Sequence, residues 1–327
     1  MSLMDGKALL KARNEAKNGT APAYAHYVAE LASLADQHMT TGPFSVTNGS
    51  LMPPTGDRHD YISLGGYVWP PATACNASIL KQVGVPTCAR WCHGINNCSD
   101  SSCICNETLL SLKYPGEPCN NRWYPHSGYN GEMWARIDRL QLEAFEAAVF
   151  PLTMSWWYTQ NTTYLERAVY LLRVWFLDPR TRMNPHLDYG AHEPGAFDGG
   201  PTGIVDFGHM QWIFETIRLV EFAGSPTWTA ADAQGMQAWM DDFHSWFDNA
   251  PNSKLALKIS NDIGTIVIQI GLSTSLFAGD RAAARFLAAN QTTTMLSRLL
   301  CATGAFCRDS AAIGADSFGY HLRPTVT

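Results

Sequence analysis

The sequence has few charged residues and no long hydrophobic run. Charged side chains make up 16% of its 327 residues, against about a quarter in an ordinary globular protein. No stretch approaches the roughly 18 consecutive apolar residues of a membrane-spanning helix. Lysine and arginine form no basic run, and the formal net charge is −6. We therefore expect neither a membrane partner nor a nucleic acid partner.

Common motifs of cofactor and nucleophile chemistry are also missing. The sequence contains no Gly-rich phosphate loop and no Ser nucleophile elbow. No set of His, Asp and Glu residues has the spacing of a metal site, and His192, His209 and His244 stand in no motif. The sequence therefore gives no signal of a phosphate-binding loop, a nucleophilic Ser or a metal site.

The nine cysteines are concentrated in one part of the chain. Seven lie at irregular spacing between Cys75 and Cys119, whereas Cys301 and Cys307 lie near the end. Zinc sites are built from close pairs at regular spacing, so we favour disulfides over zinc. An odd number leaves one thiol over, or paired outside the chain.

Glycosylation signals favour the same oxidising environment. Together with the cysteines they predict a secreted, extracellular protein. The segment Met1 to Lys17 has no signal-peptide core, so we expect the numbering to start on a mature or trimmed chain. The Asn-x-Ser/Thr triplets begin at Asn18, Asn48, Asn76, Asn97, Asn106, Asn161 and Asn290.

Apolar residues recur at helical spacing over most of the chain outside the cysteine-rich part. No alternating run is long enough to build a sheet, so the pattern predicts an all-α stack of antiparallel helical hairpins. Trp239 and Trp246 lie on an apolar stripe and are expected in the core. The predicted helices cover residues 7–39, 137–152, 165–175, 207–217, 236–247, 263–277 and 280–300.

Three segments are too polar to be simple helix connections. The first contains His59, Tyr61, Tyr67 and Trp69, the second Asn184, His186 and Tyr189, and the third Asn261 and Asp262. Aromatic rings stack on sugar rings, and polar groups bind hydroxyls and carboxylates, so these segments favour a carbohydrate site. Loop-anchoring hydrogen bonds are the simpler alternative for each. Asp178 and Arg182 are interpreted as a structural cap and ion pair.

These segments resemble motifs of the alginate lyase family of polysaccharide lyases. Residues 59–70 are similar to the family signature HDYxSLxPYWWP, and residues 175–189 to WFLDPxTRMNPxLDYAQ. The resemblance implies an (α/α) toroid or incomplete barrel of helical hairpins over residues 1–327, with a Cys-rich insertion at 72–121. It also implies β-elimination on an acidic polysaccharide, a polyuronate such as alginate, without a cofactor.

In that reaction hydrogen-bond donors neutralise the carboxylate of a uronic acid while a base removes the neighbouring C5 proton. The resemblance implies Asn, His and Arg as neutralisers and Tyr as base and acid. Asn261 and Arg323 are therefore the expected neutralisers, supported by His186 or His59. Tyr320 or Tyr189 is the candidate for proton transfer. His59, Tyr61, Tyr67, Trp69, Asn184, Tyr189 and Asp262 are the expected substrate contacts.

The third segment departs from the family pattern. The family reads Asn-Asn-His-Gly-Thr, whereas this chain has Asp262 and Ile263 at the second and third positions. Isoleucine cannot donate a hydrogen bond, and a charged aspartate repels a substrate carboxylate. Near the end, Arg323 matches the family arginine, which would place the following Tyr beyond Thr327. In the rival alignment Tyr320 is itself the catalytic Tyr.

Two other functions remain open from the sequence. A glycoside hydrolase on the same fold would need a pair of carboxylates facing the groove, and Asp60 and Asp188 are the loop acids to consider. A catalytically impaired or truncated homologue that only binds acidic carbohydrate is the other alternative, which Ile263 favours.

The cysteine pattern gives the first prediction. We expect three disulfides within Cys75 to Cys119 and a fourth between Cys301 and Cys307, because irregular spacing and interleaved glycosylation signals are typical of a disulfide framework. Intact mass before and after reduction should differ by the hydrogens of four bridges. Free thiols at most of these positions, or one equivalent of zinc, would contradict it.

Overall fold

The computed structural model describes residues 4–49, 51–66, 68–69, 124–125, 138–193, 197–259 and 261–299. The cysteine-rich insertion, all four expected disulfides and the C-terminal segment after residue 299 lie outside these residues. Among the described residues, none of the helices combines the length and the hydrophobicity of a membrane span.

Helices dominate the described chain, and its strands are only two to four residues long. The α-helices are α1 (Gly6–Asn18), α2 (Pro22–His38), α5 (Asp138–Thr159), α6 (Thr162–Leu172), α7 (Met210–Ala223), α8 (Ala230–Asn249), α9 (Pro251–Ala256), α10 (Asp262–Ala278), α11 (Arg281–Phe286) and α12 (Thr292–Leu299). The other elements are η1 (Val46–Asn48), η5 (Arg173–Leu177), η6 (Pro201–Phe207), η7 (Leu287–Gln291), β1 (Ile62–Leu64), β2 (Val68–Trp69), β3 (Tyr124–Pro125) and β4 (Tyr189–His192).

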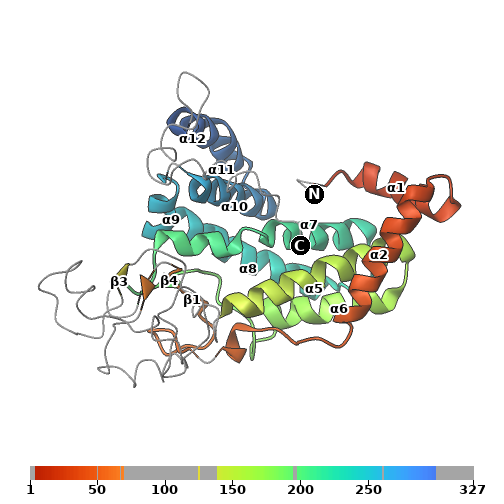
Figure 1. Ribbon diagram of the computed structural model, residues 1–327, viewed down its shortest axis with the longest axis horizontal. Coiled ribbons are helices and arrows are strands. Elements are labelled where there is room, and N and C mark those ends of the chain that lie inside the picture. Colours follow the sequence, from red (N-terminus) through yellow and green to blue (C-terminus); the bar gives the residue numbers. More distant parts are fainter. Residues whose placement is uncertain are drawn as a thin grey trace, which may run out of the picture.

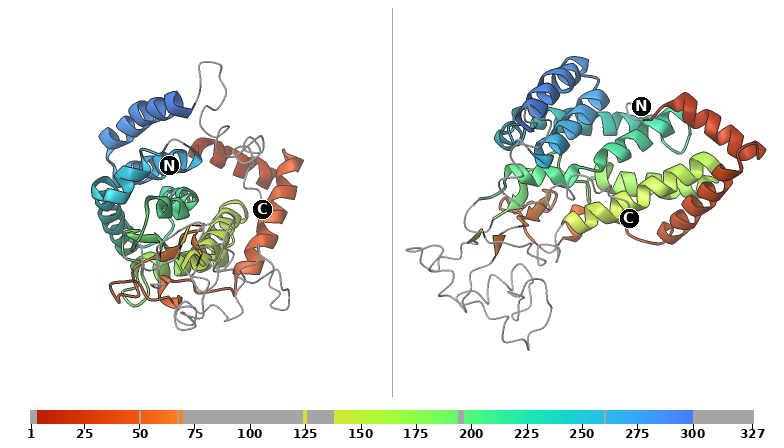
Figure 2. Two further views of the ribbon diagram at one scale, coloured as in Figure 1. Left: turned by 60° about the vertical axis from the view of Figure 1, so that its left-hand side comes forward. Right: turned by 45° about the horizontal axis from the view of Figure 1, so that its top comes forward.

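Successive helices pack against one another and follow an arc. α5 packs between α2 and α6, and α10 packs on both α7 and α8. Figure 1 shows α7 between α5 and α10, and the left view of Figure 2 shows the helices curving around the molecule. The prediction of an all-α stack of hairpins is confirmed.

The first predicted helix, residues 7–39, is wrong in one respect. The structure has two helices there, because α1 ends at Gly19, which adopts a left-handed φ of 68°. Pro22 then starts α2 at a position where its missing N–H costs nothing. Glycine and proline therefore divide a segment whose apolar spacing alone reads as one helix.

A chain of aromatic contacts runs through the core towards the first polar segment. Tyr61 stands at its end and is fully buried, which corrects the expectation that its side chain contacts a substrate. Such ring pairs contribute about 0.5–1.5 kcal/mol each beyond the area that they bury. The successive contacts are Phe145–Trp175, Phe145–Phe176, Phe176–Trp239, Trp239–Phe243, Phe243–Phe207 and Phe207–Tyr61.

Close backbone packing holds β4 against η6. A Cβ atom on Gly203 would lie 2.1 Å from the carbonyl carbon of Gly190, and one on Gly199 would lie 1.9 Å from the carbonyl oxygen of Asp188. These contacts are with backbone, which cannot swing aside. The two glycines therefore let η6 approach the strand that carries the second polar segment.

This packing gives a stability prediction. Gly199→Ala should lower the free energy of unfolding by about 1–3 kcal/mol, because the added methyl group overpacks the Asp188 backbone. Urea unfolding followed by circular dichroism measures the change. Gly200→Ala is the matched control, since a Cβ atom there meets its nearest neighbour at 3.7 Å. Equal stability of the two variants would contradict the close approach.

Candidate functional site

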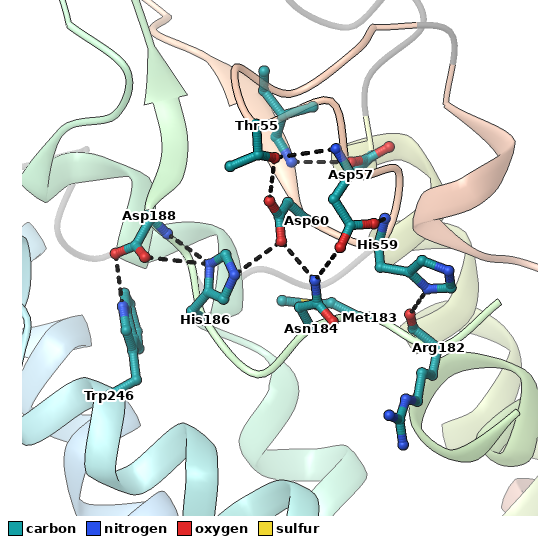
Figure 3. Close-up of polar contacts among 12 residues, drawn as sticks. Thr55, Asp57, His59, Asp60, Arg182, Met183, Asn184, His186, Asp188 and Trp246 are labelled. Atoms are coloured by element: carbon teal, nitrogen blue, oxygen red, sulfur yellow. Dashed lines mark hydrogen bonds and ion pairs between the residues drawn. The ribbon is translucent and has the colours of Figure 1, made fainter. Parts of the chain in front are cut away.

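The first two polar segments lie side by side although about 120 residues separate them. β1 pairs with β4 in parallel, with Ile62 opposite Tyr189. The main chain of Asn184 donates to the carbonyl of His59 at 2.8 Å. The two segments therefore converge, and Figure 3 shows the cluster that results.

Asp60 is the centre of this cluster. Its side chain is buried, at 4% exposure, and both of its oxygens accept. Oδ2 accepts from the Thr55 hydroxyl at 2.5 Å, and Oδ1 accepts from Asn184 Nδ2 at 2.7 Å and lies 2.9 Å from His186 Nε2. Removing the buried carboxylate would leave these donors unpaired.

His59 is held in one tautomer by the main chain. Its Nδ1 lies 2.6 Å from the carbonyl oxygen of Arg182, which can only accept, so Nδ1 carries the hydrogen. In the neutral ring Nε2 then keeps its lone pair and can accept a proton. Asp57 orients the same loop: the hydrogen bond from the His59 amide is the main cause that lowers the pKa of Asp57.

His186 uses both ring nitrogens inside the cluster. Nε2 faces Asp60, and Nδ1 accepts from the Asp188 amide at 3.4 Å and lies 3.5 Å from the Asp188 carboxylate. The ring also meets Tyr189 edge-on at 5.9 Å between centroids. Burial is the main cause that raises the pKa of Tyr189, so its hydroxyl stays protonated and can donate.

Trp246 belongs to this cluster, which corrects its expected place in the core. The indole is half-buried on α8, and its Nε1 donates to Asp188 Oδ1 at 2.7 Å. Sequence spacing missed this because Trp246 also packs against the core residue Phe243. Trp239, by contrast, is buried as predicted and donates to the Met183 carbonyl at 2.8 Å.

A second buried carboxylate, that of Asp206, binds residues next to the cluster. Asp206 Oδ2 accepts from the hydroxyls of Tyr61 at 3.0 Å and Ser63 at 2.5 Å. Its Oδ1 pairs with Arg139 at 3.1 Å. Burial raises the pKa of Tyr61 well above its usual value, so that hydroxyl remains a donor. Asp206, in η6, therefore links that element to β1 and α5.

The family model of alginate lyase matches residues 45–323 of the sequence. The chain belongs to the alginate lyase family. A solved alginate lyase structure from Bacteroides ovatus is similar, with 24% sequence identity and a TM-score of 0.68 over 90% of this chain. The match covers 64% of that protein's chain. No curated protein matches the sequence. The family and the similar structure support the predicted (α/α) toroid fold.

The altered third family motif forms the start of α10. Asn261 caps the helix, because its Oδ1 accepts from the Ile263 amide at 3.0 Å. Its Nδ2 donates to no other described residue, which leaves that amide available to a ligand. Ile263 packs partly buried against the core. Within the described chain, no hydrogen bond joins Asn261 or Asp262 to the Asp60 cluster.

Several expected site residues belong to segments outside the described part of the chain. Tyr67, Tyr320 and Arg323 lie outside the described residues, and only the backbone of Trp69 is described, in β2.

Asp178 forms its ion pair with Arg180, at 2.7 Å, rather than the expected pair with Arg182. Hydrogen bonds from Arg180 are the main cause that lowers the pKa of Asp178 to about 2.

One group of possible metal ligands occurs among the described residues. His244, Asp248 and Asp280 bring their ligand atoms within 4.8 Å of one another. His244 Nε2 lies 3.4 Å from Asp280 and 3.6 Å from Asp248, and its buried Nδ1 lacks the acceptor that usually orients a metal-bound imidazole. The hydrogen bond between His244 and Asp280, which links α8 to the start of α11, explains this group.

The buried Asp60 carboxylate gives the site prediction. Asp60→Asn should lower the free energy of unfolding by about 1–3 kcal/mol, because an amide group then faces donors that need acceptors. Thermal unfolding measures the loss. Asp57→Asn is the matched control, since Asp57 is exposed and bonds the same Asn184 amide at 3.1 Å. A larger loss for Asp57→Asn would show that Asp60 is not the centre of the cluster.

Proposed function

We propose that this protein is a secreted polysaccharide lyase of the alginate lyase type that binds a polyuronate, with reduced turnover. The observation that carries the proposal is the convergence of His59, Asn184, His186 and Tyr189 in one polar cluster, edged by the half-buried Trp246. An aromatic edge beside fixed polar groups suits a sugar ring with hydroxyls and a carboxylate. Family membership gives the reaction class.

The residues divide into structural and reactive roles. Asn184 and His186 are committed to Asp57, Asp60 and Asp188, so they shape the site and do not neutralise the substrate. His59 Nε2 is available to take the C5 proton, and the protonated Tyr189 hydroxyl is available to give one to the departing O4 oxygen. The Nδ2 amide of Asn261 is available to neutralise the carboxylate.

The alternative hydrolase is disfavoured by the same contacts. A glycosidase needs one carboxylic acid that can protonate the leaving group and a second carboxylate that faces the sugar. Asp60 is buried and accepts from two donors while it pairs with His186. Asp188 is half-exposed but is held by Trp246 and His186. Both acids serve to fix the loops.

Secretion is supported by the described glycosylation signals. Asn18, Asn48, Asn161 and Asn290 are all exposed, as an acceptor asparagine must be. Asn161, whose Oδ1 caps α6, keeps its Nδ2 free of described partners. The Nδ2 of Asn48 instead donates to the Pro43 carbonyl at 2.9 Å and to Gln141 Oε1 at 3.0 Å, and glycosylation there would disturb both bonds. The proposal of a glycosylated extracellular protein is therefore compatible with the folded chain.

Binding and turnover can be tested separately. We expect the 327-residue chain to be retained on alginate or glucuronan and to produce little unsaturated product by ultraviolet absorbance. Ile263→His should raise turnover by about 10²–10³-fold, because it restores a donor of the kind that stabilises developing negative charge. Leu276→His, at the exposed far end of α10, is the matched control.

Three outcomes would contradict the proposal. Vigorous turnover by the unaltered chain would show that the third motif does not limit the reaction. Absence of retention on every polyuronate would remove the binding function as well. Retention without product from either chain would leave a carbohydrate-binding protein and remove the enzymatic function.

A further inference from the structure

A histidine outside the loop cluster lies exposed at the start of α7. The His209 side chain is 58% exposed, and its Nδ1 lies 3.8 Å from Glu146 Oε2 on α5. No side chain caps α7 at this position. The start of a 14-residue helix carries partial positive charge, which favours an anion there.

Glu146, behind His209, is a buried acid with an unused oxygen. Its side chain is 9% exposed, and Oε1 has no hydrogen-bond partner among the described residues. Burial is the main cause that raises its pKa well above the usual value, and the charges of Glu143 and Asp206 act in the same direction. Burial therefore favours the neutral, protonated form of Glu146, which weakens its repulsion of an anion beside His209.

An exposed aromatic ring lies one turn further along α7. Trp212 and His209 are three residues apart, so their side chains share one face of the helix. The Trp212 side chain is 41% exposed. Its ring packs edge-on against Phe150 of α5, with 6.2 Å between the ring centroids.

The start of α10 lies against the same place. A Cβ atom on Gly208, the residue before His209, would lie 3.2 Å from the Ile266 side chain. Ile266 is one turn from Asp262, so it shares a face of α10 with the first residue of that helix. His209 thus stands where α5, α7 and α10 meet, next to the helix that Asn261 caps.

We propose that His209 and Trp212 form a binding subsite for one acidic sugar unit, in which His209 binds the carboxylate and Trp212 stacks on the ring. This inference rests on the proposed polyuronate function and names where an acidic unit is held outside the loop cluster. The imidazole Nε2 and the uncapped helix start provide the attraction for the carboxylate. The indole provides a flat apolar surface for the sugar ring.

The test is calorimetric titration of the full chain, at low salt, with alginate and glucuronan oligosaccharides and with the same oligosaccharides after carboxyl reduction. His209→Ala should weaken binding of the acidic oligosaccharides about 10-fold or more, because a hydrogen bond to a charged group is lost. It should leave binding of the reduced oligosaccharides within about twofold. Trp212→Ala should weaken both about 3–10-fold.

Two further variants separate charge from structure. His209→Lys should restore most of the affinity for the acidic oligosaccharides, because lysine supplies a charged hydrogen-bond donor at the same place. His26→Ala is the matched control: it removes another exposed histidine that pairs with a glutamate, Glu30, at 3.1 Å on α2. Circular dichroism confirms that each variant is folded.

The outcomes distinguish the two proposals. If the unaltered chain binds the acidic oligosaccharides and His209→Ala binds them equally well, the subsite is wrong and the proposed function stands. If His209→Ala weakens the acidic and the reduced oligosaccharides equally, carboxylate binding by His209 is wrong. If the unaltered chain binds none of them, the proposed function fails and the subsite fails with it.

Discussion

Two buried carboxylates hold the candidate site together. Asp60 joins the loop before β1 to the loop before β4, and Asp206 joins β1 to α5 and η6. A buried charge is stable only when donors surround it, so each carboxylate requires its neighbours to keep their positions. The loops are consequently fixed from within. The series of aromatic contacts ends at Tyr61, whose ring packs on Phe207 and whose hydroxyl donates to Asp206. Packing in the helical core therefore helps to fix the position of the Asp206 carboxylate.

Helix existence could be predicted from the sequence because burial of one face imposes a regular spacing on apolar residues. The spacing of apolar residues could not predict where the side chains of Tyr61 and Trp246 lie. Tyr61 lies in a polar segment, yet its ring ends a buried aromatic chain and its hydroxyl reaches Asp206, 145 residues away. Trp246 lies on an apolar stripe, yet its Nε1 donates to Asp188 across 58 residues. Both roles depend on partners that only the folded chain brings close.

The second polar segment was the easiest part of the site to predict. Asn184 and His186 lie in a loop that contains Pro185, and Tyr189 begins β4 directly after that loop. A segment this polar beside a proline does not fit the helical pattern. The sequence could not indicate that the polar atoms of Asn184 and His186 are already used in contacts within the protein. His186 has both nitrogens occupied, and Asn184 Nδ2 bridges Asp57 and Asp60. Whether a polar residue serves the ligand or the fold is decided by its partners, which spacing does not encode.

The groups that remain available to a ligand are those whose polar atoms are not used by contacts within the described chain. His59 Nε2 keeps a lone pair because a carbonyl fixes the hydrogen on Nδ1, and Asn261 Nδ2 is left over after its oxygen caps α10. His209 adds an exposed imidazole beside α10, where Ile263 gives no donor. Binding requires attraction to a carboxylate on any sugar unit of the polysaccharide. Elimination requires hydrogen-bond donors at the carboxylate of the one unit whose C5 proton is removed. In the proposed function, Ile263 at the start of α10 supplies no donor for elimination, whereas His209 and Trp212 serve binding alone, so different side chains meet the two requirements.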